Sequence, residues 1–220
     1  MRKIDKTTIL STDYKKWEEA LPESHPKYNS SKNEYYYDII MNLFHCQKGL
    51  CAYTEMLLCE PEPLDETIWE NEKYPYPTDE SLFNGQLDHY DSTKKIAQAW
   101  LWDNLFMVDS DTNRRKGTKN IEEILKPDRE NYDPFKLLEY NSQLNIFLAN
   151  TDLENGIQEK INHQLKNVLG INHPVVVRKR RIIGILIDSI LHGNKTWENI
   201  EITEFPTAFE FCKREVLKFP

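Results

Sequence analysis

The stretch from Asp88 to Gly117 constrains the fold more than any other part of this sequence. It reads L-D-H-Y at 87–90, W-D-N-L at 102–105 and D-T-N-R-R-K-G at 111–117. An acid and a histidine lie side by side on a short segment that we expect to be β. An asparagine follows on the next apolar segment, and a second asparagine opens a basic helix. This order predicts a small mixed unit that gathers polar side chains at one site.

These residue types suit hydrolysis of a phosphodiester, which needs a base to activate water and a cation to stabilise developing charge. His89 fits the base, because neutral imidazole is available at cellular pH. Asp88 suits a hard cation such as Mg²⁺ or Mn²⁺, and the amide oxygen of Asn113 offers a second ligand. Neighbours on a strand point to opposite faces, so Asp88 and His89 share a site only if the strand twists or ends there.

The remaining polar residues of this stretch are expected to play supporting roles. A buried Asn104 can bond the backbone on both sides of a loop and so hold the segment of His89 in position. Arg114, Arg115 and Lys116 fall in the first turn of the expected helix, where they can contact flanking phosphates or the leaving group.

The overall charge limits how the chain can engage a polyanion. Its 220 residues carry 36 acidic and 28 basic side chains, a formal net charge of −8. Affinity for nucleic acid comes largely from Lys and Arg that neutralise phosphates, so this balance is unusual for such a substrate. Basic residues gather at 114–119 and 178–181, whereas residues 55–80 are strongly acidic. Either these local basic residues are enough to bind nucleic acid or a partner contributes to binding. The basic run at 178–181 fits a substrate or partner surface and a solvated helix face equally well.

Composition and cysteine usage indicate a folded protein of a reducing compartment. With 39% hydrophobic residues and five tryptophans, the chain can bury a core. Its four cysteines show no C-x-x-C spacing, and the N-terminus has no apolar core typical of a signal peptide. No apolar run is long enough to span a bilayer. We therefore expect a cytoplasmic location and no membrane partner.

We expect three parts along the chain: a polar N-terminal arm at 1–31, a motif-bearing domain at 32–126 and a mainly helical domain at 127–220 that follows a linker at 127–134. Apolar spacing and capping residues predict helices at 33–45, from Asp152 to Gly170, from Pro174 to Gly193 and from Pro206 to Leu217. Other patterns predict a short β segment at 50–53, an acidic surface loop at 60–85 and a hairpin at 135–149.

The order of these residues resembles that of the HNH endonucleases, and the resemblance covers residues 51–119 best. In that family a D-H pair gives a metal ligand and the general base, an N-L pair gives an organising asparagine, and a final His or Asn before a basic residue gives the other ligand. Asp88, His89, Asn104 and Asn113 fall on those positions in order. The resemblance implies an α+β fold, with an HNH ββα-metal unit embedded in a mainly helical chain, and a divalent-cation-dependent endonuclease.

One departure from the family concerns its structural zinc, which many members hold on two C-x-x-C pairs. The four corresponding positions here are Cys51, Thr54, Asp109 and Thr112. Threonine is not a usual zinc ligand, so we expect no structural zinc and a unit that relies on packing and hydrogen bonds.

The second half is similar to the nuclease subunit of Septu-type and retron-associated anti-phage defence systems, through L-G-I-N-H at 169–173 followed by Arg178 and Arg181. This resemblance implies an SMC-like ATPase partner and a role as the effector of a defence system. DNA is the expected substrate. Cleavage of RNA such as tRNA by the same site remains open, because no base-reading module is evident. A noncatalytic HNH-derived scaffold that binds the ATPase or nucleic acid is the alternative from another class.

Overall fold

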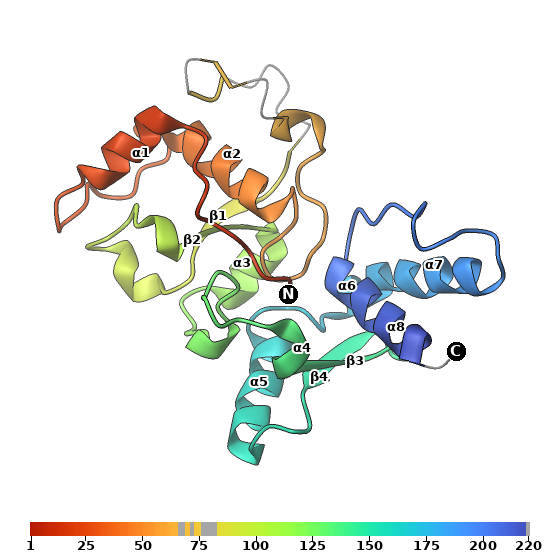
Figure 1. Ribbon diagram of the computed structural model, residues 1–220. Helices are drawn as coiled ribbons and strands as arrows, with labels where there is room; N and C mark the ends of the chain where they lie inside the picture. The colour runs from red at the N-terminus through yellow and green to blue at the C-terminus, as the bar shows by residue number, and fades with distance from the viewer. Residues whose placement is uncertain (66–68, 71–72, 76–82, 219–220) are drawn as a thin grey trace. The chain divides into compact units, whose positions relative to one another are not determined.

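The computed structural model describes the whole chain except residues 66–68, 71–72, 76–82 and 219–220. It is an α+β protein with helices and small antiparallel sheets (Figure 1). The chain divides into two compact units. The motif unit comprises Ile4–Ala52 and Leu57–Ile121, and the C-terminal unit comprises Met1–Lys3, Tyr53–Met56 and Glu122–Pro220.

Two helices of the motif unit precede its strands. Helix α1 spans Thr12–Glu19, and helix α2 spans Tyr36–Gln47, close to the helix expected at 33–45. Most of α2 is buried, and its last residue, Gln47, seals the edge of a strand: Nε2 donates to the carbonyl of Met107 (2.8 Å) and Oε1 accepts from the Met107 amide (2.9 Å). A polar side chain thus satisfies backbone groups that would otherwise be buried without partners.

Two antiparallel strands and a helix follow one another, in the order expected from the sequence (Figure 1). Strand β1 spans Gln86–His89 and pairs with β2, Leu105–Val108, so that His89 lies opposite Leu105. Helix α3 spans Ser110–Lys116, and the side chain of its N-cap Asp109 accepts a hydrogen bond from the Thr112 amide (3.0 Å). It ends at Gly117, whose φ of 51° favours a residue without a Cβ.

The N-terminal residues do not form the loose arm that we expected. Ile4 and Tyr14 are buried in the core, and Lys6 lies against the rings of Trp102 and Phe106. The Lys6 ammonium donates to the backbone carbonyls of Trp102 and Leu105. The polarity of this segment was misleading because a lysine stem covers apolar surface while its charged end finds carbonyl oxygens.

The segments at 50–53 and 60–85 also differ from expectation. Leu50 makes an isolated bridge to Leu57 in place of a strand over 50–53. Part of the expected acidic loop lies outside the described residues. Its described part contains a 3₁₀ turn at Glu62–Leu64 and a bridge between Glu70 and Lys73.

The C-terminal unit contains the expected hairpin, strands β3 (Leu138–Asn141) and β4 (Ile146–Ala149), preceded by the short helix α4 (Pro134–Leu137). Helix α5 spans Asn155–Asn167, and Gly170, at φ 67°, follows it. The residues expected to be a linker are packed in this unit, since Tyr132 is buried and its hydroxyl donates to the Met1 carbonyl (2.7 Å).

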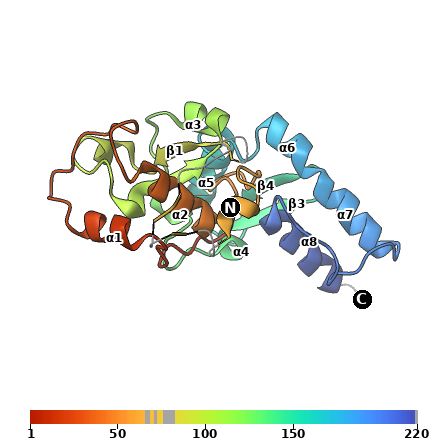
Figure 2. The same ribbon diagram turned by 90° about the horizontal axis from the view of Figure 1, so that it is seen from above.

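The helix expected from Pro174 to Gly193 is two helices, α6 (Pro174–Arg180) and α7 (Ile182–Leu191), and α8 (Pro206–Lys218) packs beside α7 (Figure 2). Arg180, in the basic run, is buried and donates to the carbonyls of Asn145 (2.9 Å) and Ile171 (2.7 Å). It therefore braces the unit, while Arg178, Lys179 and Arg181 are exposed. No helix among the described residues is long and apolar enough to cross a membrane.

A buried carboxylate also organises the C-terminal unit. Glu55 accepts hydrogen bonds from the Thr207 amide (2.9 Å) and hydroxyl (2.5 Å), and one of its oxygens lies 3.2 Å from the amino group of Met1. Burial by itself raises the pKa of Glu55, but the amino group and the Thr207 donors outweigh it and hold this pKa below its usual value. Glu55 is therefore a charged group whose ionisation stabilises the folded unit.

Candidate active site

The facing sides of β1 and α3 carry two parallel polar contacts. Gln86 and Asp88 are two residues apart on β1, so their side chains share a face of the strand. Asn113 Nδ2 donates to Gln86 Oε1 (3.0 Å), and Lys116 Nζ lies 3.0 Å from Asp88 Oδ1. Asp88 and Asn113, the two expected metal ligands, are thus brought to the same interface between strand and helix.

We expected Lys116 to lie on the surface with the arginines, but it does not. Its side chain is fully buried, and its ammonium contacts both Asp88 Oδ1 and the backbone carbonyl of His89 (2.6 Å). A buried ammonium needs a countercharge and hydrogen-bond acceptors, and β1 supplies both. Lys116 therefore neutralises Asp88 and ties the end of β1 to α3, and it does not face a phosphate in this structure.

The His89 side chain has surroundings different from those of Asp88, as opposite faces of a strand require. Its Nε2 lies 2.8 Å from the carbonyl of Ala99, and its ring meets the edge of Tyr28 at a centroid distance of 5.4 Å. Because a carbonyl oxygen only accepts, Nε2 is the donor, and the neutral ring keeps Nδ1 as its acceptor. His89 is the last residue of β1, and the contacts described for its ring do not include Asp88 or Asn113.

Burial lowers the pKa of His89 to about 4, the Ala99 hydrogen bond acts in the opposite direction, and the ammonium groups of Lys95 and Lys116 lower it further. The imidazole is therefore neutral at cellular pH and able to accept a proton, but burial makes it a weaker base than an exposed histidine.

Asn104 holds the loop that follows His89. Its Oδ1 accepts from the amide of Asp91 (2.8 Å), and its Nδ2 donates to the carbonyl of the same residue (3.0 Å). The backbone of Asn104 also accepts from the Tyr90 amide (2.8 Å). The side chain and the backbone of Asn104 together thus fix the two residues after His89 against the start of β2, the arrangement expected of an organising asparagine.

The two arginines lie on the outer side of α3. Arg114 is exposed and pairs with Asp111 at 2.6 Å, and Arg115 is partly buried, 4.0 Å from the same carboxylate. Exposed pairs of this kind contribute little to stability. The exposed Arg114 guanidinium can therefore exchange Asp111 for a phosphate at small energetic cost.

The donor types at the interface of β1 and α3 fit a magnesium-like cation. A carboxylate from Asp88 and an amide oxygen from Asn113, with water completing the shell, are ligands that Mg²⁺ accepts. The Asn113 bond to Gln86 uses Nδ2 and does not use Oδ1. Among the residues that the structure describes, no three His, Cys, Asp or Glu side chains gather as a metal-binding group.

Three of the four positions at which we expected no structural zinc, Cys51, Asp109 and Thr112, lie in the motif unit and are joined by hydrogen bonds. Cys51 Sγ lies 3.5 Å from Asp109 Oδ2 and 3.5 Å from the Asp109 amide, and Asp109 in turn caps α3 through Thr112. The fourth position, Thr54, belongs to the C-terminal unit. This network joins the segment of Cys51 to the first turn of the helix.

Sequence reasoning gave Lys116 a different role and missed two other participants in this site, Tyr28 and the Ala99 carbonyl. The role of Lys116 was detectable, because it lies one helical turn after Asn113 and so faces the same strand. Tyr28 and the Ala99 carbonyl gave no signal, since a long-range contact and a loop backbone leave no pattern in the sequence. Comparison with protein-family models and with curated proteins finds no match for this chain.

Proposed function

We propose that this chain is a divalent-cation-dependent endonuclease of the HNH type, which cleaves phosphodiester bonds in DNA. The observation that carries the proposal is the environment of His89, whose Nε2 donates to the Ala99 carbonyl and whose segment is held by Asn104. A neutral imidazole with a fixed tautomer and an acceptor at Nδ1 is the form of histidine that takes a proton from water.

In the proposed mechanism, His89 Nδ1 accepts the proton of the attacking water, and the Ala99 carbonyl stabilises the resulting imidazolium through Nε2. Asp88 and Asn113 would hold the cation, which when bound would supply positive charge that stabilises the phosphorane and the leaving oxygen. Lys116 orients the Asp88 carboxylate, and Arg114 and Arg115 contact flanking phosphates. Asn104 keeps the loop of His89 in place.

The biological setting is part of the proposal and rests on the resemblance to Septu-type and retron-associated nucleases. We place the chain in the cytoplasm as the effector of an anti-phage defence system with an SMC-like ATPase partner. The net charge of −8 supports a partner, because a basic partner surface would supply nucleic-acid affinity that this chain lacks.

A nuclease assay tests the proposal. The purified protein, with and without a co-purified ATPase, is incubated in Mg²⁺ with plasmid DNA and with total tRNA. We expect the wild-type protein to cleave nucleic acid, and we expect both chelator and His89→Ala to abolish this cleavage. The control variant His163→Ala, in the C-terminal unit, should still cleave. Equal background cleavage in wild type and His89→Ala would favour a noncatalytic scaffold, and cleavage of tRNA alone would replace DNA by RNA as substrate.

A further inference from the structure

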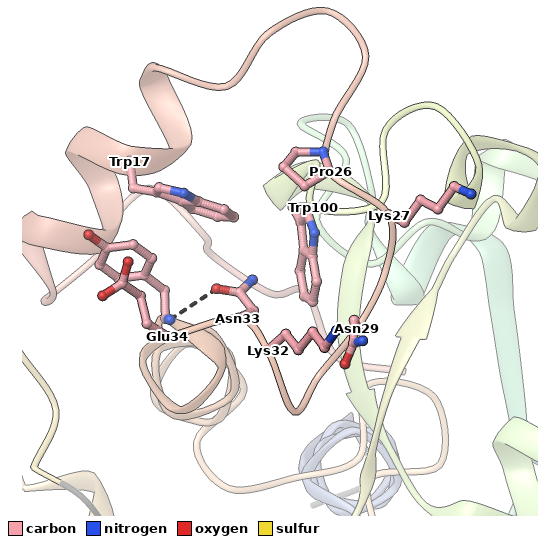
Figure 3. Close-up of a pocket in the computed structure, with 9 residues that line it drawn as sticks. Trp17, Pro26, Lys27, Asn29, Lys32, Asn33, Glu34 and Trp100 are labelled. Atoms are coloured by element: carbon pink, nitrogen blue, oxygen red, sulfur yellow. Dashed lines mark hydrogen bonds between the residues drawn. The ribbon is translucent and has the colours of Figure 1, made fainter.

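A cavity of about 390 Å³ opens in the motif unit beside α1 and the segment that leads into α2 (Figure 3). Its walls include Trp17, Tyr35 and Trp100, and its rim carries Lys27 and Lys32. This volume falls within the range of roughly 300–1,000 Å³ that is typical of small-molecule sites. None of the roles assigned above to the candidate active site uses this cavity.

The walls of the cavity are aromatic. Trp17 and Tyr35 lie 5.2 Å apart between ring centroids, and Trp17 and Trp100 lie 6.3 Å apart at an interplanar angle of 67°. Trp100, on the side opposite Trp17, is only 1% exposed, while Trp17 and Tyr35 are half-buried and offer ring surface to a ligand (Figure 3). Aromatic rings of this kind are the platforms on which unpaired nucleobases stack.

Asn33 adds a hydrogen-bond donor that has no partner. Its Oδ1 accepts from the Tyr35 amide (2.9 Å), the bond drawn in Figure 3, whereas its Nδ2 is buried and makes no hydrogen bond within the described part of the chain. Figure 3 places this amide at the foot of the gap between the two indole rings. A buried donor without a partner is costly, and a ring nitrogen or carbonyl oxygen of a nucleobase would satisfy it.

The charge at the rim favours a phosphate-bearing ligand. The lining residues include two lysines, Lys27 and Lys32, and one carboxylate, Glu34. The local balance is thus positive in a chain whose net charge is −8. A nucleotide matches this combination, because its base suits the aromatic walls and its phosphate suits the lysines.

The cavity shares a wall with the candidate active site. Trp100 directly follows Ala99, whose carbonyl accepts from His89. Tyr28 stacks on Trp100 at 4.9 Å and meets His89 edge-on at 5.4 Å. These two ring contacts place Trp100 no farther from the candidate base than about three nucleotide spacings of roughly 3.4 Å each.

We propose that this cavity binds one unstacked nucleobase of the substrate strand, a few nucleotides from the bond that is cleaved. The substrate class is then single-stranded or locally unpaired nucleic acid, because a base within continuous duplex must leave its stack to enter such a pocket. This inference rests on the proposed function and specifies the substrate of the same site. DNA and RNA both offer the required chemistry.

Binding measured in chelator tests the inference without any cleavage. Fluorescence anisotropy compares labelled single-stranded DNA, single-stranded RNA of the same sequence and the matching DNA duplex. Trp17→Ala removes a wall, and Asn33→Asp keeps the acceptor for Tyr35 while removing the free donor. Trp197→Ala, in the C-terminal unit, is the control. We expect single strands to bind more tightly than duplex, and Trp17→Ala to weaken that binding by about 5- to 150-fold, the equivalent of roughly 1–3 kcal/mol.

The Asn33→Asp variant, which preserves the local backbone bond, is also expected to bind single strands more weakly. The relative affinity for the DNA and RNA strands identifies which nucleic acid occupies the cavity. Equal affinity for single strand and duplex, or unchanged affinity in both cavity variants, would overturn the inference. Cleavage of duplex DNA by Trp17→Ala at the wild-type rate would also overturn it while leaving the proposed nuclease function intact.

Discussion

Replacing Lys116 by methionine should destabilise the motif unit by about 3–5 kcal/mol, because it leaves the Asp88 carboxylate buried without its countercharge. The two side chains are 0% and 5% exposed, with 3.0 Å between Nζ and Oδ1. At an effective dielectric constant of about 20, their attraction is roughly 5 kcal/mol. The substitution also removes the donor to the His89 carbonyl, at roughly 1–3 kcal/mol. Movement of Asp88 toward water offsets part of this sum.

A double-mutant cycle isolates the ion pair from other effects of the substitution. Asp88→Asn with Lys116→Met removes both charges, so the double variant should be more stable than Lys116→Met alone. We expect a coupling energy of about 2–3 kcal/mol. Arg114→Met is the matched control on the same helix, because its pair with Asp111 is exposed and should contribute less than about 1 kcal/mol.

Urea unfolding followed by tryptophan fluorescence measures these changes. The signal reports mainly on the motif unit, which contains four of the five tryptophans of the chain: Trp17, Trp69, Trp100 and Trp102. If Lys116→Met unfolds within about 0.5 kcal/mol of wild type, as an ordinary surface substitution would, the reasoning about the buried pair is refuted.

Three further predictions concern other parts of the chain. Glu55→Gln should destabilise the C-terminal unit by about 2–4 kcal/mol at pH 7. Because the folded pKa of Glu55 is lowered, the extra stability of the wild type should be lost as pH falls below about 4.5. Urea unfolding at several pH values measures this loss. Asn104→Ala should cost about 2–4 kcal/mol and speed hydrogen exchange at the Asp91 amide; unchanged exchange there would contradict its organising role. Asn113→Ala should weaken Mn²⁺ binding in calorimetry on the order of tenfold or more, and equal affinity would remove Asn113 from the ligand set.

The local part of the site was predictable from sequence, and the tertiary part was not. The strand that carries His89, the strand that follows Asn104 and the helix that carries Asn113 lie where the short-range sequence pattern indicates. Lys116 and Lys6 misled because charged residues are expected at the surface, yet both ammonium groups find acceptors inside the motif unit. Only the folded chain reveals such partners.

In the C-terminal unit, too, elements set by local pattern were predicted and elements set by tertiary contacts were not. Helix α5 and the hairpin of β3 and β4 were predicted from periodicity and turn residues. The division between α6 and α7 was not, because apolar spacing continues across Arg181 while buried Arg180 is held by the carbonyls of Asn145 and Ile171. The supposed linker at 127–134 contains proline and charged residues, but Tyr132 anchors it through Met1.

The most direct test of the central claim is the Mg²⁺-dependent initial rate of phosphodiester cleavage by His89→Ala relative to wild type. Each protein is first shown to be folded by its urea midpoint. Loss of a general base predicts a fall of about 100- to 10,000-fold, with the residual rate still sensitive to chelator. A His89→Ala rate within about threefold of wild type would contradict the assignment of His89 as the base. Absence of cleavage by the wild-type protein on plasmid DNA, single strands and tRNA would contradict the nuclease function itself.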